Sequence, residues 1–294
     1  MSSKITFIGG DIRMIEAARF AAKKHKEVII YGFDKLEKNF DTYDVTIETN
    51  LKEALSGADT VIFGLPSSVD GKNIFAPYSS KDIPICSVIS YIKPSAYVFG
   101  GMLKEYIQKE AETKGIKCFD YFLREELTLK NALVTAEGAL QTAMTETPHT
   151  IHSSKCLVIG YGRIGKMLSD ILKKLGATVT CSARKESDLA LIECNAMEAV
   201  NTSLIGKSIG RFDIIFNTVP FSILEEKNLA SVRHDALIID LASKPGGVDF
   251  ESARKLGLKV IWATSLPGKV APETSGKIIS DTVFNILNEQ KVRR

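Results

Sequence analysis

A glycine motif between a predicted strand and a predicted helix constrains the fold of this chain most strongly. Gly160, Gly162 and Gly165 have the spacing GxGxxG, directly follow an apolar run, and precede apolar residues with helical spacing. In such a strand–turn–helix unit the first glycine permits a tight turn, the second lets a pyrophosphate approach the backbone, and the third lets helix and strand pack closely. The amides and positive dipole at the helix start, near Arg163 and Ile164, would then hold the phosphates. The motif therefore predicts a dinucleotide site; the alternative is a structural glycine-rich turn.

The end of the next predicted strand indicates which dinucleotide binds. This strand ends about 20 residues past the motif, where NAD-binding chains usually carry an Asp or Glu for the ribose 2′-hydroxyl. Here the chain has Ser182, Arg184 and Lys185 instead. A hydroxyl and two cations suit a 2′-phosphate, which an Arg binds with its planar fork of donors. We therefore expect NADP rather than NAD, unless the two cations are ordinary solvated side chains.

Length and composition are those of a globular protein with two domains. The chain has 294 residues, of which 45% are hydrophobic and 25% charged, typical values for a globular fold. Its net charge of +3 is too small to indicate a nucleic-acid partner, and no apolar stretch approaches the roughly 20 residues that span a bilayer. The five cysteines and four histidines match no metal-ligand spacing. We expect a cytoplasmic protein without a metal site, in which Cys156 and Cys181 are free thiols in core strands.

Both halves of the chain alternate short apolar, β-branched runs with helical patterns. This alternation predicts an α/β fold of two Rossmann-like, doubly wound domains with parallel sheets, joined by a long helix. The expected strands are 5–8, 28–31, 60–63, 85–89, 97–99 and 117–119 in the first half, and 156–159, 178–182, 214–217, 237–240 and 259–263 in the second. The expected parts are an α/β substrate or partner domain (1–134), a connecting helix (135–150), a nucleotide domain (151–270) and a C-terminal helix (271–294).

Two helical segments connect these domains in the prediction. The first places Glu137 in its first turn, where the helix dipole favours a carboxylate; the alternative is a role for Glu137 in ligand binding. The last segment has one apolar stripe formed by Ile279, Val283, Ile286 and Leu287. We expect this stripe to pack back on the first domain, which would connect the two domains twice.

The two halves resemble each other but differ at the glycine motif. Residues 59–68 align with residues 213–222 in the second half. When the glycine motif is aligned with the corresponding segment of the first half, Asp11 occupies the position of the second glycine and Met14 occupies that of the third. A carboxylate repels a pyrophosphate and a Met side chain obstructs close helix–strand packing. We therefore expect no nucleotide in the first half.

In the second half, the loops that follow the later predicted strands contain polar residues together with Gly and Pro. Open parallel sheets bind ligands beyond the carboxyl ends of their strands, so these loops are candidate ligand contacts. In the loop 217–220, Asn217 and Thr218 are candidates for contacts with the ribose or the nicotinamide amide, and Val219 leads to Pro220, which stiffens the turn. The loops 240–247 and 266–274 are the other two candidates. An ordinary Gly/Pro turn is the alternative for each.

With these segments identified, the sequence resembles the dipicolinate synthase A-subunit family of spore-forming bacteria. The resemblance covers nearly the whole chain and rests on residues 8–13, 135–138, 159–165, 217–220, 240–247 and 266–274. The glycine motif alone is generic, whereas the last two segments beside it are specific. The resemblance implies oxidation of dihydrodipicolinate to dipicolinate in the mother cell during sporulation, with a second, flavoprotein-like B subunit. We also expect an oligomer.

The implied chemistry suits the candidate residues. Oxidation of a dihydropyridine removes a hydride and a proton, and the aromatic product makes the step favourable, so positioning supplies most of the acceleration. A small dicarboxylate substrate needs cations, and Arg13 and Lys244 are expected to hold its carboxylates from opposite domains. Ser243 and Thr274 would orient it, and Glu137 is a further candidate. No residue is identified as a catalytic acid or base.

Two other functions are compatible with the same architecture. A D-2-hydroxyacid dehydrogenase would need an Arg for the substrate carboxylate and a Glu–His pair for proton transfer, but the loop after Asp240 offers no Arg and no His follows it. A non-catalytic subunit that binds NADP while another chain performs the reaction is the second alternative.

Overall fold

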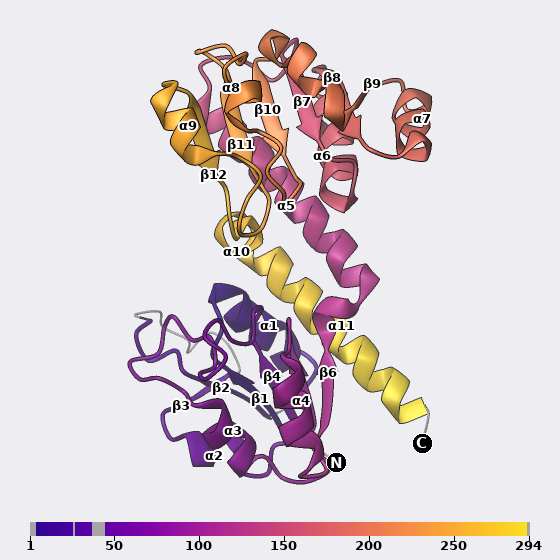
Figure 1. Ribbon diagram of the computed structural model, residues 1–294. Helices are drawn as coiled ribbons and strands as arrows, with labels where there is room; N and C mark the ends of the chain where they lie inside the picture. The colour runs from indigo at the N-terminus through magenta and orange to yellow at the C-terminus, as the bar shows by residue number, and fades with distance from the viewer. Residues whose placement is uncertain (1–3, 26, 37–44, 293–294) are drawn as a thin grey trace. The chain divides into compact units, whose positions relative to one another are not determined.

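The computed structural model describes residues 4–25, 27–36 and 45–292. The chain divides into two compact units, of which unit 1 comprises Met1–Asn131 and Ala271–Arg294 and unit 2 comprises Ala132–Val270. Each unit contains a six-stranded sheet (Figure 1). Every strand pair in both sheets is parallel. The predicted α/β fold with two parallel sheets is therefore confirmed.

Unit 1 is a doubly wound sheet with the strand order β3-β2-β1-β4-β5-β6. Its strands are β1 (Lys4–Ile8), β2 (Glu27–Tyr31), β3 (Thr46–Glu48), β4 (Thr60–Phe63), β5 (Tyr97–Gly100) and β6 (Lys117–Asp120). Its helices are α1 (Ile12–Ala22), α2 (Leu51–Leu55), α3 (Ile85–Tyr91), α4 (Glu105–Glu112), the 3₁₀ turn η1 (Tyr121–Leu123) and α11 (Pro272–Val292). Successive side chains of a strand point to opposite faces, so α1 and α11 cover one apolar face while α2, α3 and α4 cover the other.

Unit 2 has the same topology, with the order β9-β8-β7-β10-β11-β12. Its strands are β7 (Lys155–Ile159), β8 (Thr178–Ala183), β9 (Glu198–Asn201), β10 (Ile214–Asn217), β11 (Leu237–Asp240) and β12 (Lys259–Trp262). Its helices are α6 (Arg163–Lys174), α7 (Glu186–Cys194), α8 (Glu226–Leu229), α9 (Phe250–Lys255), α10 (Leu266–Val270) and the 3₁₀ turns η2 (Thr202–Lys207) and η3 (Ile209–Arg211). The carboxyl ends of β7 and β10 are adjacent, and this is where the strand order reverses and where such sheets bind ligands.

Three elements differ from the prediction. Residues 85–89 were expected to form a strand, but they belong to helix α3. The buried residues Ile85, Val88 and Ile89 have the i, i+3, i+4 spacing of a helix face. The prediction was wrong because this apolar run was interpreted as a buried strand and not as one face of a helix. The short edge strands β3 and β9 were not expected, because their residues are exposed or half-buried and form no apolar run.

Helix α5 (Glu125–Glu146) continues from unit 1 into unit 2 along the chain. It begins well before the expected segment 135–150, so Glu137 lies in its interior. The expectation that Glu137 occupies the first turn is wrong, because residues 125–134 extend the helix toward the N-terminus. Within unit 2 the buried residues Ala136, Ala139 and Ala143 pack α5 against the sheet.

The C-terminal helix returns to unit 1 as predicted. Helix α11 contacts α1, and its stripe of Ile279, Val283, Ile286 and Leu287 is buried in the core that α1 shares. The approach is close at Gly276, where an added Cβ would come within 2.6 Å of the carbonyl oxygen of Arg13. A small residue at this position is what lets the two backbones come together.

Two further expectations concern thiols and membranes. Cys156 and Cys181 are free thiols buried in β7 and β8, as predicted, and burial raises the pKa of each thiol to about 12. Such thiols remain protonated and behave as small apolar side chains.

Among the described helices, none is long and apolar enough to cross a membrane.

Candidate dinucleotide-binding site

The three motif glycines of unit 2 have three different local reasons to be glycine. Gly160 has φ +94°, and a Cβ there would lie 2.6 Å from the hydroxyl oxygen of Thr218. A Cβ on Gly165 would overlap the carbonyl oxygen of Gly160. Gly162 differs, because no protein atom lies within 4 Å of the position that its Cβ would take. The first and third glycines permit the turn and the packing, and the second leaves open space in front of the turn.

The N-terminus of α6 is available to an anion. Its N-cap is Gly162, which provides no side-chain hydrogen bond to the first amides. The corresponding helix of unit 1 is capped by Asp11, whose carboxylate accepts a hydrogen bond from the amide of Arg13. Since free amides and the helix dipole favour a bound phosphate, only the first arrangement suits a pyrophosphate.

The turn of unit 1 is also filled by its own chain. The amide of Gly10 donates to the carbonyl of Phe75 at 2.6 Å, and a Cβ on Gly9 would come within 2.8 Å of Ala76. Met14 is fully buried beside Gly10. These contacts support the expectation that this turn does not receive a nucleotide.

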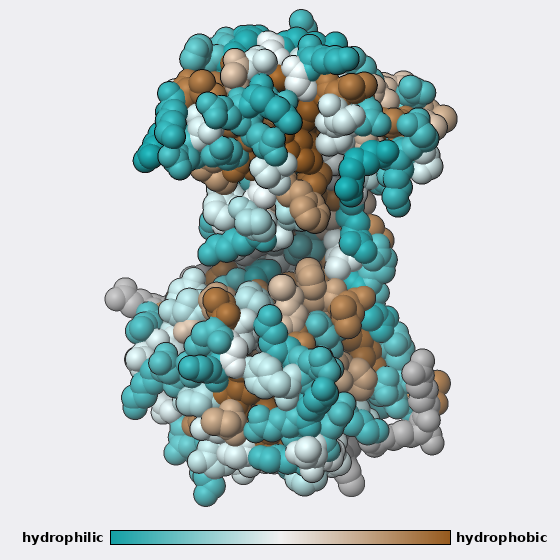
Figure 2. Space-filling model, in the orientation of Figure 1, coloured by the Kyte–Doolittle hydropathy of each residue, from teal (hydrophilic) through white to brown (hydrophobic). Residues whose placement is uncertain are grey.

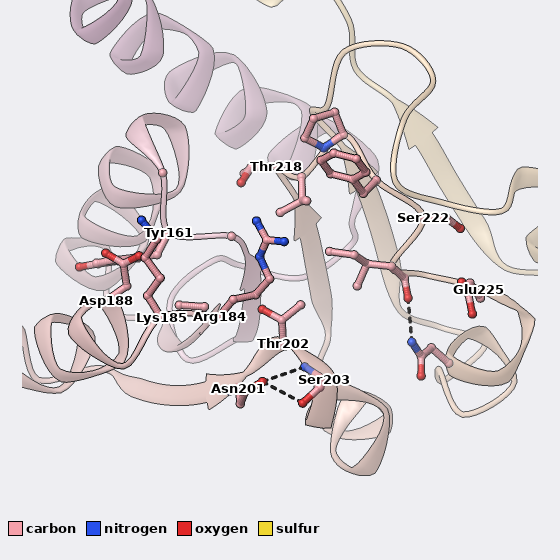
Figure 3. A pocket seen from close by; sticks show the side chains of 18 of the residues that line it. Tyr161, Arg184, Lys185, Asp188, Asn201, Thr202, Ser203, Thr218, Ser222 and Glu225 are labelled. Carbon is pink, nitrogen blue, oxygen red and sulfur yellow. Dashed lines mark hydrogen bonds between the residues drawn. The ribbon is translucent and has the colours of Figure 1, made fainter.

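A pocket of about 670 Å³ opens in unit 2 in front of the β7–α6 turn (Figure 3). It is lined by the glycine turn, the ends of β8 and β9, the loop after β10, and residues of α7 and α8. Seven of the residues predicted to bind the cofactor are on its wall, namely Gly160, Gly162, Arg184, Lys185, Thr218, Val219 and Pro220. The pocket therefore joins the phosphate turn to the strand end where the 2′ position of an adenosine is expected.

Arg184 points into this pocket. Figure 3 shows its guanidinium group between Thr218 and Thr202. Arg184 and Lys185 are exposed, and within the described ranges the structure gives neither side chain an ion pair or a hydrogen bond. Their charges are therefore not neutralised by the protein. Asp188 also lines the pocket, beside Lys185 in Figure 3, so one carboxylate lies near the two cations.

The segment after β9 adds polar groups that the sequence analysis missed. Thr202 and Ser203 line the pocket, and the Asn201 side chain accepts hydrogen bonds from the amide and the hydroxyl of Ser203. The parallel pairing of β8 and β9 brings this segment beside Arg184. Recognition of β9 as a strand would have indicated these residues, because its end must lie next to the end of β8.

Five other predicted cofactor residues are not part of the pocket wall, namely Arg163, Ile164, Gly165, Ser182 and Asn217. The hydroxyl of Ser182 is buried, where the amide of Gly160 and the hydroxyl of Thr202 donate to it at 3.4 and 3.3 Å. The amide group of Asn217 is likewise buried and hydrogen-bonded within the protein.

The loop after β10 supplies an apolar wall. Thr218 donates its hydroxyl proton to the carbonyl of Ile159, which fixes the loop on the end of β7. Val219 and Pro220 follow, and the ring of Phe221 is 67% exposed at the pocket. Figure 2 shows a largely hydrophilic surface on which hydrophobic side chains gather over the β10 region of this unit. An apolar wall with a few polar groups is the usual form of a cofactor pocket.

The predicted substrate residues are distributed over both units. Arg13 and Thr274 belong to unit 1, and Glu137, Ser243 and Lys244 belong to unit 2. Arg13 is buried, pairs with both carboxylate oxygens of Asp11 at 2.8 Å, and donates to the carbonyl of Leu65. The other four are exposed. Their contact with a substrate stays a prediction.

The chemistry of the pocket fits a phosphorylated dinucleotide. The open space at Gly162 and the uncapped α6 suit a pyrophosphate, and the cations at the end of β8 suit further negative charge. Burial raises the pKa of Tyr161, so this phenol remains neutral at physiological pH.

Comparisons with known proteins agree with the division of the chain. Residues 4–122 match the family model of the N-terminal domain of the dipicolinate synthase A subunit. Residues 122–246 match the model of the NAD-binding domain of D-isomer-specific 2-hydroxyacid dehydrogenases. An NAD- or NADP-binding domain is therefore present.

Relatives match over the whole chain. The dipicolinate synthase A subunit of Bacillus subtilis (strain 168) is 31% identical over 289 residues, which cover 97% of this chain and 96% of the relative. The crystal structure of the same subunit from Bacillus subtilis has a TM-score of 0.86 at 29% identity and covers 100% of this chain and 98% of that one. The subunit from Bacillus halodurans has a TM-score of 0.84 at 27% identity, with 98% of each chain covered. A transhydrogenase from Sinorhizobium meliloti shares the fold, with a TM-score of 0.71 at 14% identity over 98% of this chain and 94% of that one.

Proposed function

This chain belongs to the dipicolinate synthase A-subunit family, and from that premise we propose that it is the NADP-dependent oxidoreductase subunit that oxidises dihydrodipicolinate to dipicolinate. It acts with a B subunit in the mother cell of a sporulating bacterium. The observation that carries the proposal is the pocket of unit 2, where an open glycine turn and the unpaired Arg184 lie on one wall.

The choice of NADP rests on the charge at the end of β8. A 2′-phosphate there would meet Arg184 and Lys185 and the hydroxyls of Thr202 and Ser203. NAD-specific sites carry a carboxylate at the end of this strand. The nearby carboxylate of this pocket, Asp188, belongs to α7 instead, so the cations outnumber it at the strand end.

Binding and positioning are the contributions of the protein to this reaction. The amides at the start of α6 would hold the pyrophosphate, and the nicotinamide ring, when bound, supplies the hydride acceptor. Lys244 and Arg13 would pair with the two carboxylates of the substrate, and Ser243 and Thr274 would orient it, with Glu137 as a further contact. Arg13 already pairs with Asp11 and donates to the carbonyl of Leu65, so a substrate carboxylate would have to compete with Asp11 for its guanidinium group.

The likeness to D-2-hydroxyacid dehydrogenases concerns the nucleotide domain only. The family model that matches residues 4–122 is that of the dipicolinate synthase A subunit. The loop after β11 also lacks the Arg, and the chain beyond it the His, that a hydroxyacid oxidation would require. A hydroxyacid dehydrogenase activity is therefore not favoured.

An activity assay distinguishes catalysis from a purely structural use of NADP. The purified chain, supplied with NADP⁺ and freshly prepared dihydrodipicolinate, is expected to form NADPH and dipicolinate in equal amounts. NADPH formation only after addition of the B subunit would show that the chain needs its partner. No NADPH formation under either condition would contradict the proposed activity, and turnover of D-2-hydroxyacids would identify the rival one.

Replacement of Arg184 tests the choice of cofactor. Arg184→Ala removes the guanidinium group at the 2′ end, so we expect NADPH binding to weaken roughly 10- to 100-fold, the effect of losing a charge-assisted hydrogen bond of about 1.5–3 kcal/mol. NADH binding should change little. Fluorescence titration measures both, with Arg254→Ala as the control because it removes an exposed Arg elsewhere in unit 2. Equal loss of NADPH and NADH binding would refute the assignment.

A further inference from the structure

Two polar residues meet inside unit 2 at the ends of adjacent strands. Asn217 ends β10 and Asp240 ends β11, and both are fully buried. The side-chain nitrogen of Asn217 donates to Oδ1 of Asp240 at 2.8 Å. A buried carboxylate is unfavourable unless hydrogen bonds replace its lost water. Packing alone therefore does not explain why a carboxylate and an amide occupy these two buried positions.

Asp240 collects donors from two different loops. Besides Asn217, the amide of Ala242 donates to its Oδ1 at 3.0 Å and the amide of Gly247 donates to its Oδ2 at 2.8 Å. On the other side, Asn217 donates to the carbonyl of Val219 at 3.0 Å and accepts from the Val219 amide at 3.2 Å. One carboxylate thus connects the loop after β10 with the loop after β11.

These two loops carry the residues of the proposed function. Val219 and the residues up to Ile223 form one wall of the nucleotide pocket, and the second loop carries Ser243 and Lys244. They are also in close contact through Gly247, where a Cβ would lie 2.5 Å from the carbonyl oxygen of Val219. Further along, the amide of Ile223 donates to the carbonyl of Gly247 at 3.1 Å.

The fold itself does not require this pair. Unit 1 has the same strand order, and Phe63 and Gly100 end its equivalent strands β4 and β5. An apolar ring and a glycine therefore suffice to close the same two strand ends. The buried Asn–Asp pair occurs in the unit that carries the open glycine turn.

We infer that Asp240 is a positioning residue that holds the nucleotide-pocket wall (219–223) and the Ser243–Lys244 loop in one fixed arrangement. The inference rests on the proposed function of this pocket. Asp240 is fully buried and does not line the pocket, so it would act through the two loops that it connects. Loss of its acceptors should therefore loosen both binding surfaces together.

Asp240→Asn tests this role with almost no change in volume. Its NH₂ group must face either the amide of Gly247 or the donors on the other oxygen, so at least one donor loses its acceptor. We expect the Kd for NADPH to rise about tenfold, as for the loss of one buried hydrogen bond to a charged group. The KM values for NADP⁺ and for the dicarboxylate should rise together.

The single tryptophan of the chain gives an independent spectroscopic readout. The indole nitrogen of Trp262 donates to the carbonyl of Ala242 at 2.9 Å, and its ring lies 5.3 Å from that of Phe250. In Asp240→Asn the Ala242 segment should move, so the emission of Trp262 should shift to longer wavelength. This readout requires no ligand.

Asp120→Asn is a matched control in unit 1. Asp120 also ends a strand and accepts three amides, those of Met102, Leu103 and Phe122. Its replacement should lower stability without changing the Kd for NADPH or the emission of Trp262. A purely structural role of Asp240 predicts the same behaviour for both variants.

Gly247→Ala provides a second variant that leaves the carboxylate intact. Its methyl group would overlap the side-chain nitrogen of Asn217 and press on the carbonyl oxygen of Val219, so it should disturb the Asn217–Asp240 contact and reproduce the weaker NADPH binding and the Trp262 shift. Wild-type affinity for NADPH in both Asp240→Asn and Gly247→Ala would overturn the inference and leave the proposed function standing. Lack of NADPH binding by the wild-type chain would instead overturn the proposed function.

Discussion

At the scale of single residues, Gly162 and Gly165 lie at either end of the first turn of α6 and differ in the space around them. The space beyond Gly162 contains no protein atom within 4 Å of its Cβ position, whereas that of Gly165 is filled by the carbonyl oxygen of Gly160. Gly162 has φ −80°, which any residue can adopt. Gly165 is therefore required by the packing of the turn, whereas Gly162 leaves space that a ligand could occupy.

Replacement of each by alanine should separate binding from stability. Gly162→Ala should change the free energy of unfolding by about 1 kcal/mol or less, yet weaken NADPH binding at least about tenfold because the methyl group stands where the pyrophosphate approaches. Gly165→Ala should lower the free energy of unfolding by about 1–3 kcal/mol through overpacking. Urea unfolding and NADPH titration of both variants measure the two effects. NADPH binding at wild-type affinity in Gly162→Ala would argue against the phosphate site.

Residue patterns indicated much of the site but not all of it. Gly162, Arg184 and Thr218 could be identified because their spacing from the strands places them at the sheet edge. Asn217 could not be assigned correctly in the same way, because its polar side chain after a strand looks like a ligand contact, while the structure directs it to Asp240. Whether a polar group faces a pocket or a buried partner depends on neighbouring strands, and local sequence does not contain this information.

At the scale of elements, unit 1 depends on the packing of α11 against α1. The helices come from opposite ends of the chain and share one apolar core. Figure 1 shows α11 as the last helix of the chain. Its apolar stripe could be predicted from sequence, because four residues with helical spacing must be covered. The close approach at Gly276 could not, since it depends on the partner helix.

A methyl group at Gly276 should separate the two helices. In Gly276→Ala it would lie 2.6 Å from the carbonyl oxygen of Arg13 and from Cβ of Glu16, so the free energy of unfolding of unit 1 should fall by about 1–3 kcal/mol. Circular dichroism during urea unfolding measures the change, with the exposed Lys277→Ala as the control on the same helix. Equal stability of Gly276→Ala and the wild type would show that the helices do not pack as described.

Strand recognition succeeded for the buried central strands and for the edge strands β6 and β12, but it missed the other two edge strands, β3 and β9. The central strands β1, β4, β7 and β10 are almost completely buried and consist mainly of apolar residues, as is typical of parallel sheets. The edge strands β3 and β9 have mixed composition, because only part of each is covered. Without β9, Thr202 and Ser203 were missed as pocket residues. The missed edge strand thus led to an incomplete list of pocket residues.

At the scale of the whole molecule, the two units share one topology but differ at the turn that follows the first strand of each. Both units have the same strand order, but the β1–α1 turn is closed by Asp11, Met14 and the segment 74–76, whereas the β7–α6 turn is open. This difference was visible in the sequence, because it depends on single substitutions at aligned positions. We propose that unit 2 binds the cofactor and expect unit 1 to contribute to substrate or partner binding.

The most direct test of this assignment is calorimetric titration of the purified wild-type chain with NADPH and, in parallel, with NADH. The titrations are made at two temperatures, because the enthalpy of binding changes with temperature and can vanish at one of them. We expect saturable binding of one NADPH per chain and much weaker binding of NADH. Tighter binding of NADH would contradict the role of Arg184, and the absence of binding heat from both nucleotides at both temperatures would contradict the account as a whole.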